Sequence, residues 1–115
     1  MASWLLPLVV EEIEPEDLAA LLRAGPSDLL VLDVREDDER ETARIEPSIH
    51  IPMNEVPGRL IEIPTDRRVV VYCHHGHRSA MVAGYLEGQG YPRVLNLTGG
   101  IDAWAQIVDP AVPRY

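Results

Sequence analysis

Two unbroken apolar runs constrain the fold of this chain more than any other feature. Residues 29–34 read Leu-Leu-Val-Leu-Asp-Val, and residues 68–72 read Arg-Val-Val-Val-Tyr. Continuous apolar runs of this length are typical of parallel strands that are covered on both faces. Parallel neighbours are joined by crossover connections that usually contain a helix. The two runs therefore predict an α/β fold built on a parallel sheet.

The rest of the chain supplies the further strands and the helices that such a sheet requires. A helix should begin at Glu14-Pro15, carry a stripe of leucines, and end at Gly25-Pro26. In the helix at residues 79–87, the side chains expected to point inward are Met81, Val82, Tyr85 and Leu86. Further strands are expected at residues 9–13, 48–52 and 93–97, and further helices at residues 36–43, 54–60 and 101–107. We expect one domain over residues 1–115, with a mostly parallel five-stranded sheet flanked by helices on both faces.

Composition excludes several classes of function. The net charge is −9, which argues against a nucleic-acid partner. Residues 1–10 are apolar, but they lack a basic segment, contain Pro7 and precede Glu11-Glu12. We therefore expect a first edge strand there, no membrane partner, and by default a cytoplasmic location. A single cysteine, Cys73, cannot form an internal disulfide.

Cys73 ends the apolar run at residues 68–72 and is followed at once by a polar loop and a predicted helix. The loop reads His74-His75-Gly76-His77-Arg78-Ser79. A helix N-terminus and nearby cations favour a thiolate, and unpaired amide groups there bind anions. In parallel sheets, ligands lie beyond the carboxyl ends of the strands. Asp33 and Thr98 also follow strand ends, so we expect the site at this edge.

Three motifs together resemble the rhodanese-like family of single-domain sulfurtransferases. They are Leu32-Asp33-Val34-Arg35-Glu36, the loop from Cys73 to Ser79, and Asn96-Leu97-Thr98-Gly99-Gly100-Ile101-Asp102-Ala103-Trp104. The resemblance implies that Cys73 is the catalytic nucleophile and takes a sulfane sulfur from thiosulfate or a persulfide donor. It then passes the sulfur to a thiol or to cyanide, with no cofactor. A sulfur-relay protein is a further expected partner.

The resemblance also assigns roles around the cysteine. The substrate-binding residues are expected to be His74, His75, Gly76, His77, Arg78 and Ser79. Arg78 and the histidines would supply positive potential for an anionic donor, and Gly76 fits a position that needs positive φ. Ser79 would either donate a hydrogen bond to sulfur or cap the helix. Asp33 is expected to brace the loop, and Arg35 to pair with an acid.

Alternatives remain open for the loop and its neighbourhood. Four residues separate Cys73 from Arg78, whereas cysteine phosphatases and some arsenate reductases have five, so we favour sulfur over phosphate. A sulfur-carrier or regulatory module with little turnover of small donors is a second reading. Zinc is disfavoured because four ligands within one tight loop cannot easily converge tetrahedrally.

The family usually has two glycines where this chain has residues 43–48, a change expected to alter the pocket rim. The acidic run at residues 36–41 is expected to be a solvated helix face.

Overall fold

The computed structural model describes residues 10–115 and contains one five-stranded sheet. Its strands are β1 (Glu12–Ile13), β2 (Leu29–Asp33), β3 (Ile49–His50), β4 (Arg68–Tyr72) and β5 (Val94–Leu97). They lie in the order β1-β5-β4-β2-β3, and every neighbouring pair is parallel. The predicted α/β class with a parallel sheet is confirmed.

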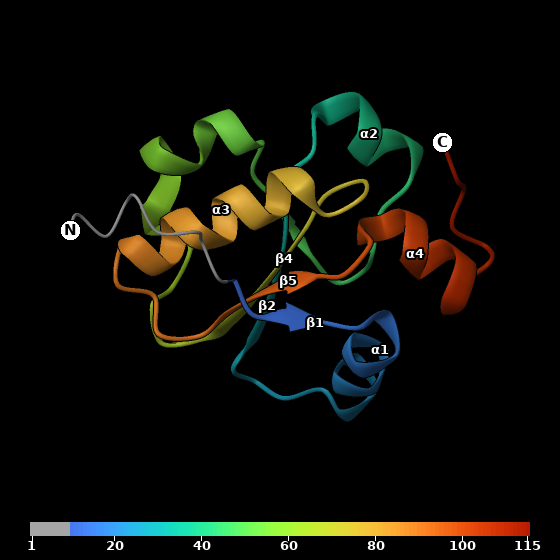
Figure 1. Ribbon diagram of the computed structural model, residues 1–115, viewed down its shortest axis with the longest axis horizontal. Helices are drawn as coiled ribbons and strands as arrows, with labels where there is room; N and C mark the ends of the chain where they lie inside the picture. The colour runs from blue at the N-terminus through green and yellow to red at the C-terminus, as the bar shows by residue number, and fades with distance from the viewer. Residues whose placement is uncertain (1–9) are drawn as a thin grey trace.

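Helices cover both faces of the sheet, as predicted (Figure 1). The elements between the strands are α1 (Pro15–Ala24), α2 (Asp37–Thr42), the 3-10 helix η2 (Met53–Glu62), α3 (His77–Gly88) and α4 (Gly100–Ile107). In Figure 1, α3 and the green η2 lie on one side of the sheet, and α1 lies on the other. Because each parallel connection crosses a face, the strand ends that precede the helices gather at one edge.

The alternation of side chains along β4 divides the core into two parts. Val69, Val71 and Cys73 belong to the cluster beneath α3 and η2, whereas Val70 and Tyr72 belong to the cluster against α1 and α4. These five side chains are almost completely buried. Neighbouring positions in a strand point to opposite faces, so Cys73 projects towards α3 while Tyr72 projects away from it.

Several predicted boundaries and orientations need correction. Helix α3 begins at His77 rather than Ser79, because Gly76 provides the left-handed turn that precedes it. Met81 and Tyr85 do not point into the core: they are 59% and 36% exposed. The helix stripe that packs on the sheet is instead formed by Val82, Ala83 and Leu86.

The short elements also differ from expectation. The segment predicted at residues 54–60 is a longer 3-10 helix with Pro57 inside it, and the strand predicted at residues 48–52 is reduced to Ile49–His50. Of the strand expected at residues 9–13, only Glu12–Ile13 is formed within the described chain. The expected edge strand in the first nine residues lies outside the described residues. No helix within residues 10–115 has the length and apolarity needed to cross a membrane.

Candidate functional site

The Cys73 sulfur lies at the carboxyl end of β4 and accepts two backbone hydrogen bonds. The Gly76 amide donates to Sγ at 3.1 Å and the Ser79 amide at 3.4 Å. The Ser79 hydroxyl oxygen lies 3.3 Å from Sγ. Cys73 is only 1% exposed. Amide donors that converge on one buried atom favour negative charge there without a counter-ion.

Two helix N-termini shape the loop from opposite sides. Gly76 has φ of +108° and turns the chain into α3, so that the first amides of that helix point back at sulfur. On the other side, the Ile101 and Asp102 amides of α4 donate to the carbonyls of Cys73 and His74, at 2.9 and 3.1 Å. These bonds fix the loop carbonyls against α4. The Gly76 and Ser79 amides donate to the sulfur instead.

The Ser79 hydroxyl lies against the Cys73 sulfur and does not cap the helix. The α3 cap is Gly76, and no side chain caps that end of the helix. The single hydroxyl proton of Ser79 is donated to Asn96 Oδ1. The amide nitrogen of Asn96 donates to the Gly76 carbonyl at 3.1 Å and to Glu12 Oε2 at 2.9 Å. Asn96 therefore connects the loop to β1.

Arg78 points at a carboxylate, not towards open solvent. Its Nη1 and Nη2 donate to the two oxygens of Glu39 at 2.7 and 2.9 Å. This pairing raises the pKa of Arg78, with a smaller contribution from the charge of Cys73. Glu39 is only 15% exposed, so the expectation that residues 36–41 form a solvated face is wrong at this position. The remaining acids of α2 are exposed.

The three loop histidines occupy different surroundings. His74 is half-buried and stacks on the Tyr115 ring, with centroids 4.0 Å apart and planes 8° from parallel. Burial, followed by the charge of His75, lowers the pKa of His74. His75 is exposed and lies 3.8 Å from Asp102, and His77 is exposed at the start of α3. The loop at neutral pH is therefore less cationic at His74 than the sequence suggests.

A cluster of His74, His75 and Asp102 brings possible metal-ligating atoms within 4.8 Å of one another. Asp102 is already engaged by Arg114, whose Nε and Nη2 donate to its two oxygens at 2.9 and 3.3 Å. The Gln106 amide donates to the same carboxylate. A metal there would have to displace a charged partner, so the donor set fits a salt bridge better than a cation site.

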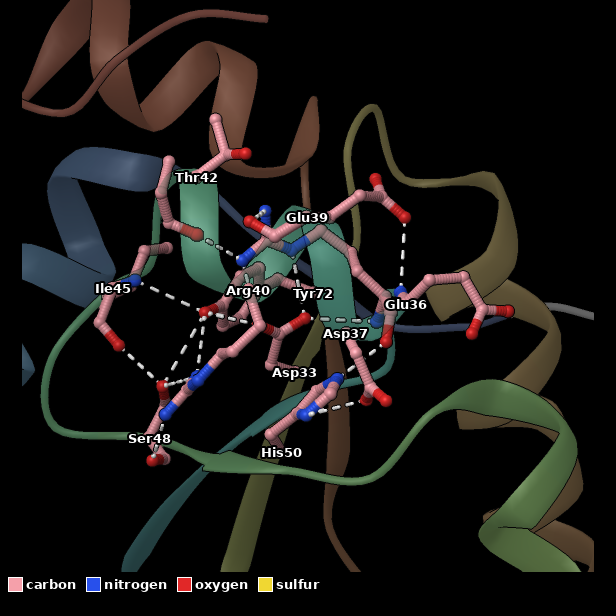
Figure 2. Close-up of polar contacts among 12 residues, drawn as sticks. Asp33, Glu36, Asp37, Glu39, Arg40, Thr42, Ile45, Ser48, His50 and Tyr72 are labelled. Carbon is pink, nitrogen blue, oxygen red and sulfur yellow. Dashed lines mark hydrogen bonds and ion pairs between the residues drawn. The ribbon is translucent and has the colours of Figure 1, made fainter.

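Asp33 and Arg35 form a buried ion pair on the face opposite Cys73. Figure 2 shows Asp33 among its other partners, Tyr72 and Arg40. Both side chains of the ion pair are 0% exposed. Arg35 Nε and Nη2 donate to the two Asp33 oxygens at 2.9 and 2.8 Å, and the Tyr72 hydroxyl donates to Oδ2 at 3.1 Å. Tyr72 precedes Cys73, so the hydrogen bonds of this pair reach the residue before Cys73 and none of residues 74–79.

Residues 43–48, where the sequence lacks the family's glycines, pack around this ion pair. The Ala43 carbonyl accepts from Arg35. The Ile45 amide donates to the Tyr72 hydroxyl at 3.1 Å, and Arg40 donates to Ser48 Oγ at 2.7 Å (Figure 2). These contacts are to residues in and around the buried pair, not to the loop residues 74–79. The altered segment therefore bears on the support of β4 more directly than on the donor site.

Thr98 and Trp104, which belong to the third sequence motif, and His50 of β3 all have structural surroundings. Thr98 donates to Glu12 Oε1 at 3.1 Å, which holds the carboxylate that bonds Asn96. His50 is half-buried, with Nε2 2.6 Å from the Arg35 carbonyl. Trp104 is buried in the core between α1 and α4. None of these three contacts the Cys73 sulfur.

Sequence reasoning missed four residues that contact the site: Glu12, Asn96, Glu39 and Tyr115. Asn96 has a visible signal, because it is a polar residue in the middle of the apolar strand β5. Glu39 has a weaker one, since Glu36 and Glu39 have capping-box spacing at the start of α2. Glu12 and Tyr115 are brought in by tertiary contacts alone, and the sequence offers no signal for them.

Fold and site define a parallel α/β protein whose single cysteine sits in an amide-lined loop between a strand and a helix. The rhodanese-like domain model matches residues 14–107. A sulfurtransferase of Allochromatium vinosum is 46% identical over 85% of this chain and 91% of its own. Thiosulfate sulfurtransferase GlpE of Pseudomonas syringae is 33% identical over 82% and 86%. A rhodanese-related protein from Thermoplasma volcanium superposes with a TM-score of 0.79 at 30% identity, over 91% of this chain and 99% of its own.

The chain belongs to the rhodanese-like family. The resemblance drawn from the three sequence motifs is confirmed. The chain is an enzyme of the general sulfurtransferase type, because its relatives over most of its length carry that activity.

Proposed function

We propose that this protein moves a sulfane sulfur through a persulfide on Cys73. The Cys73 thiolate attacks the outer sulfur of thiosulfate or of a persulfide. The sulfur–sulfur bond of the donor breaks, and sulfite or a thiolate leaves with the bonding electrons. An acceptor thiolate or cyanide then attacks the outer sulfur of the Cys73 persulfide and regenerates the thiolate.

The observation that carries this proposal is the pair of amide donors on the Cys73 sulfur, with the Ser79 hydroxyl beside them. An anionic nucleophile in a buried position needs such donors, and a persulfide carries the same charge one atom further out. The Gly76 and Ser79 amides are fixed by α3, so they need no rearrangement between the two states. We assign them to charge stabilisation, with Asp33 and Arg35 supporting β4 behind the nucleophile.

The loop favours sulfur transfer over phosphatase or arsenate reductase chemistry. Phosphate-handling cysteine loops use an arginine to enclose a tetrahedral oxyanion. Here the Arg78 fork is occupied by Glu39, and the loop has four residues between Cys73 and Arg78. A single added sulfur needs less room than a phosphate. We further propose that residues 1–115 act as one rhodanese-like domain that passes sulfur to an external thiol, free or on a relay protein.

The test is intact mass after incubation with thiosulfate or a persulfide donor. We expect the wild type to gain the mass of one sulfur and to lose it on addition of cyanide, with thiocyanate formed. Cys73→Ser should show neither change while retaining the wild-type circular dichroism spectrum. Sulfur gained by a folded Cys73→Ser variant, or no gain by the wild type with either donor, would contradict the proposal.

A further inference from the structure

Glu39 is held by four donors at the edge of the Cys73 loop, and sulfur transfer as described makes no use of it. Its Oε1 accepts from Arg78 Nη1 at 2.7 Å and from the Glu36 amide at 3.1 Å. Its Oε2 accepts from Arg78 Nη2 at 2.9 Å and from the Tyr115 hydroxyl at 2.7 Å. An ionised carboxylate accepts about four hydrogen bonds. Glu39 is therefore saturated and fixed.

Because of this arrangement, the Arg78 guanidinium is not free to bind an anionic donor. The two terminal nitrogens of a guanidinium form the fork that grips two oxygens of an anion. In this protein the fork is closed on Glu39. An anionic donor that took the same fork would have to displace Glu39 and would then face the released carboxylate. The free-energy cost of binding a donor through Arg78 therefore increases with the negative charge of the donor, because the Glu39 carboxylate repels it.

The other charges near the loop do not replace Arg78. Arg114 is paired with Asp102, and burial lowers the pKa of His74, which is held against Tyr115. Arg35 is paired with Asp33 in the interior. His75 and His77 remain as exposed groups on the loop. Each arginine near the thiol is thus neutralised by a carboxylate. The net charge of the whole protein, −9, adds no positive potential.

We propose that Glu39 is a specificity-determining residue, which occupies Arg78 and so disfavours dianionic sulfane donors relative to donors with one negative charge. Thiosulfate is the dianion, and persulfides and thiosulfonates are the singly charged class. This inference rests on the proposed function, namely that Cys73 carries the transferred sulfur. Glu39 acts through Arg78 and does not contact the reacting atoms.

Two donors of matched chemistry isolate the effect of charge. Thiosulfate gives its outer sulfur to the Cys73 thiolate and releases sulfite. Methanethiosulfonate gives the same sulfur and releases methanesulfinate, because a methyl group replaces one charged oxygen. In both cases one sulfur–sulfur bond breaks and one forms, and the leaving group keeps the bonding electrons. The two reactions differ by one unit of donor charge.

The experiment measures the second-order rate constant for loading one sulfur on Cys73, by intact mass, with each donor. Glu39→Gln keeps the shape of the side chain and a capping oxygen for α2. Glu41→Gln is the matched control, since it removes the same charge from an exposed position on the same helix. We expect Glu39→Gln to raise the ratio of thiosulfate to methanethiosulfonate rates roughly three- to tenfold. Glu41→Gln should leave this ratio unchanged.

A second pair of variants tests whether the effect passes through Arg78. In an Arg78→Gln background, the gain in the ratio from Glu39→Gln should be smaller than in the wild-type background, because only the direct repulsion between the carboxylate and the donor remains; circular dichroism must first show that both variants are folded. A gain that is as large without Arg78, an equal gain in Glu41→Gln, or a fall in the ratio in Glu39→Gln would each overturn the inference. Loading of both donors with an unchanged ratio overturns this inference alone. Failure of the wild type to load either donor overturns the proposed function, and the inference with it.

Discussion

Gly100 is the position where backbone conformation and the Cys73 loop are most tightly linked. It has φ of +62°, and a Cβ there would overlap the His74 carbonyl oxygen and lie 2.6 Å from the carbonyl oxygen of Cys73. Gly25 has nearly the same φ, +64°, but a Cβ there would meet no atom within 4 Å. The two glycines therefore separate the cost of the left-handed conformation from the cost of a clash.

We expect Gly25→Ala to lower the free energy of unfolding by about 1 kcal/mol, because left-handed strain of about 1–2 kcal/mol is partly offset by lower entropy of the unfolded chain. Gly100→Ala carries the same strain. It must also part α4 from the loop, which weakens the bonds from the Ile101 and Asp102 amides to Cys73 and His74. At about 1 kcal/mol for each bond, the expected total is about 3 kcal/mol.

Urea unfolding followed by circular dichroism measures both variants against the wild type. The alkylation rate of Cys73 in the folded protein gives a second readout. It should change in Gly100→Ala, which displaces the loop carbonyls, and stay at the wild-type value in Gly25→Ala. Equal losses of stability in the two variants, or unchanged alkylation in Gly100→Ala, would refute the close packing of α4 against the loop.

Two further predictions concern the charged groups. Asp33→Asn should lower the free energy of unfolding by about 3 kcal/mol or more, because it leaves the buried Arg35 without its counter-ion; Asp28→Asn, which removes one partner of an exposed pair with Arg68, should cost less than about 1 kcal/mol in the same urea assay. Pairing with Arg78 lowers the pKa of Glu39 from 4.5 to about 2, so its contribution to stability is complete above pH 4.5 and is lost as the pH falls towards 2. The urea midpoint should be measured at neutral pH and at pH values between 4 and 3. The drop in midpoint on acidification should be larger for the wild type than for Glu39→Gln, and an equal drop in both proteins would contradict this assignment.

The sequence predicts the sheet because almost every position of β2 and β4 must be apolar for the same reason, which is that helices cover both faces of the sheet. A strand covered on both faces must be apolar throughout, apart from Asp33 and Arg68 at the strand ends. Helices are less well determined in orientation. Met81 and Tyr85 fit an inward stripe by hydrophobicity, yet α3 rests on the sheet through the smaller Val82 and Ala83, which allow a closer approach.

The loop is predictable in its geometry but not in its electrostatics. A cysteine and a glycine ahead of a helix, with a serine in its first turn, favour amides that curl round one atom, and the local sequence contains all three. The partner of Arg78 comes from α2 and is steadied by Tyr115, far away in sequence. The local sequence of residues 36–41 predicts that all the acidic side chains in this run are exposed to solvent. Only the fold determines that one of its members turns towards the loop.

The protein has a net charge of −9, yet the proposed reaction involves anions. At the Cys73 sulfur, amide dipoles provide favourable contacts in place of cationic side chains. Two amides and a hydroxyl contact Cys73 Sγ, whereas the nearest arginine is neutralised by Glu39. Amide donors do not titrate, so their support of a thiolate or persulfide is independent of pH and weakly screened by salt in a buried site. An unpaired cation would attract any anion to the loop, including non-substrate phosphates. Dipoles that converge within hydrogen-bonding distance of one atom act only on a charge at or next to that atom.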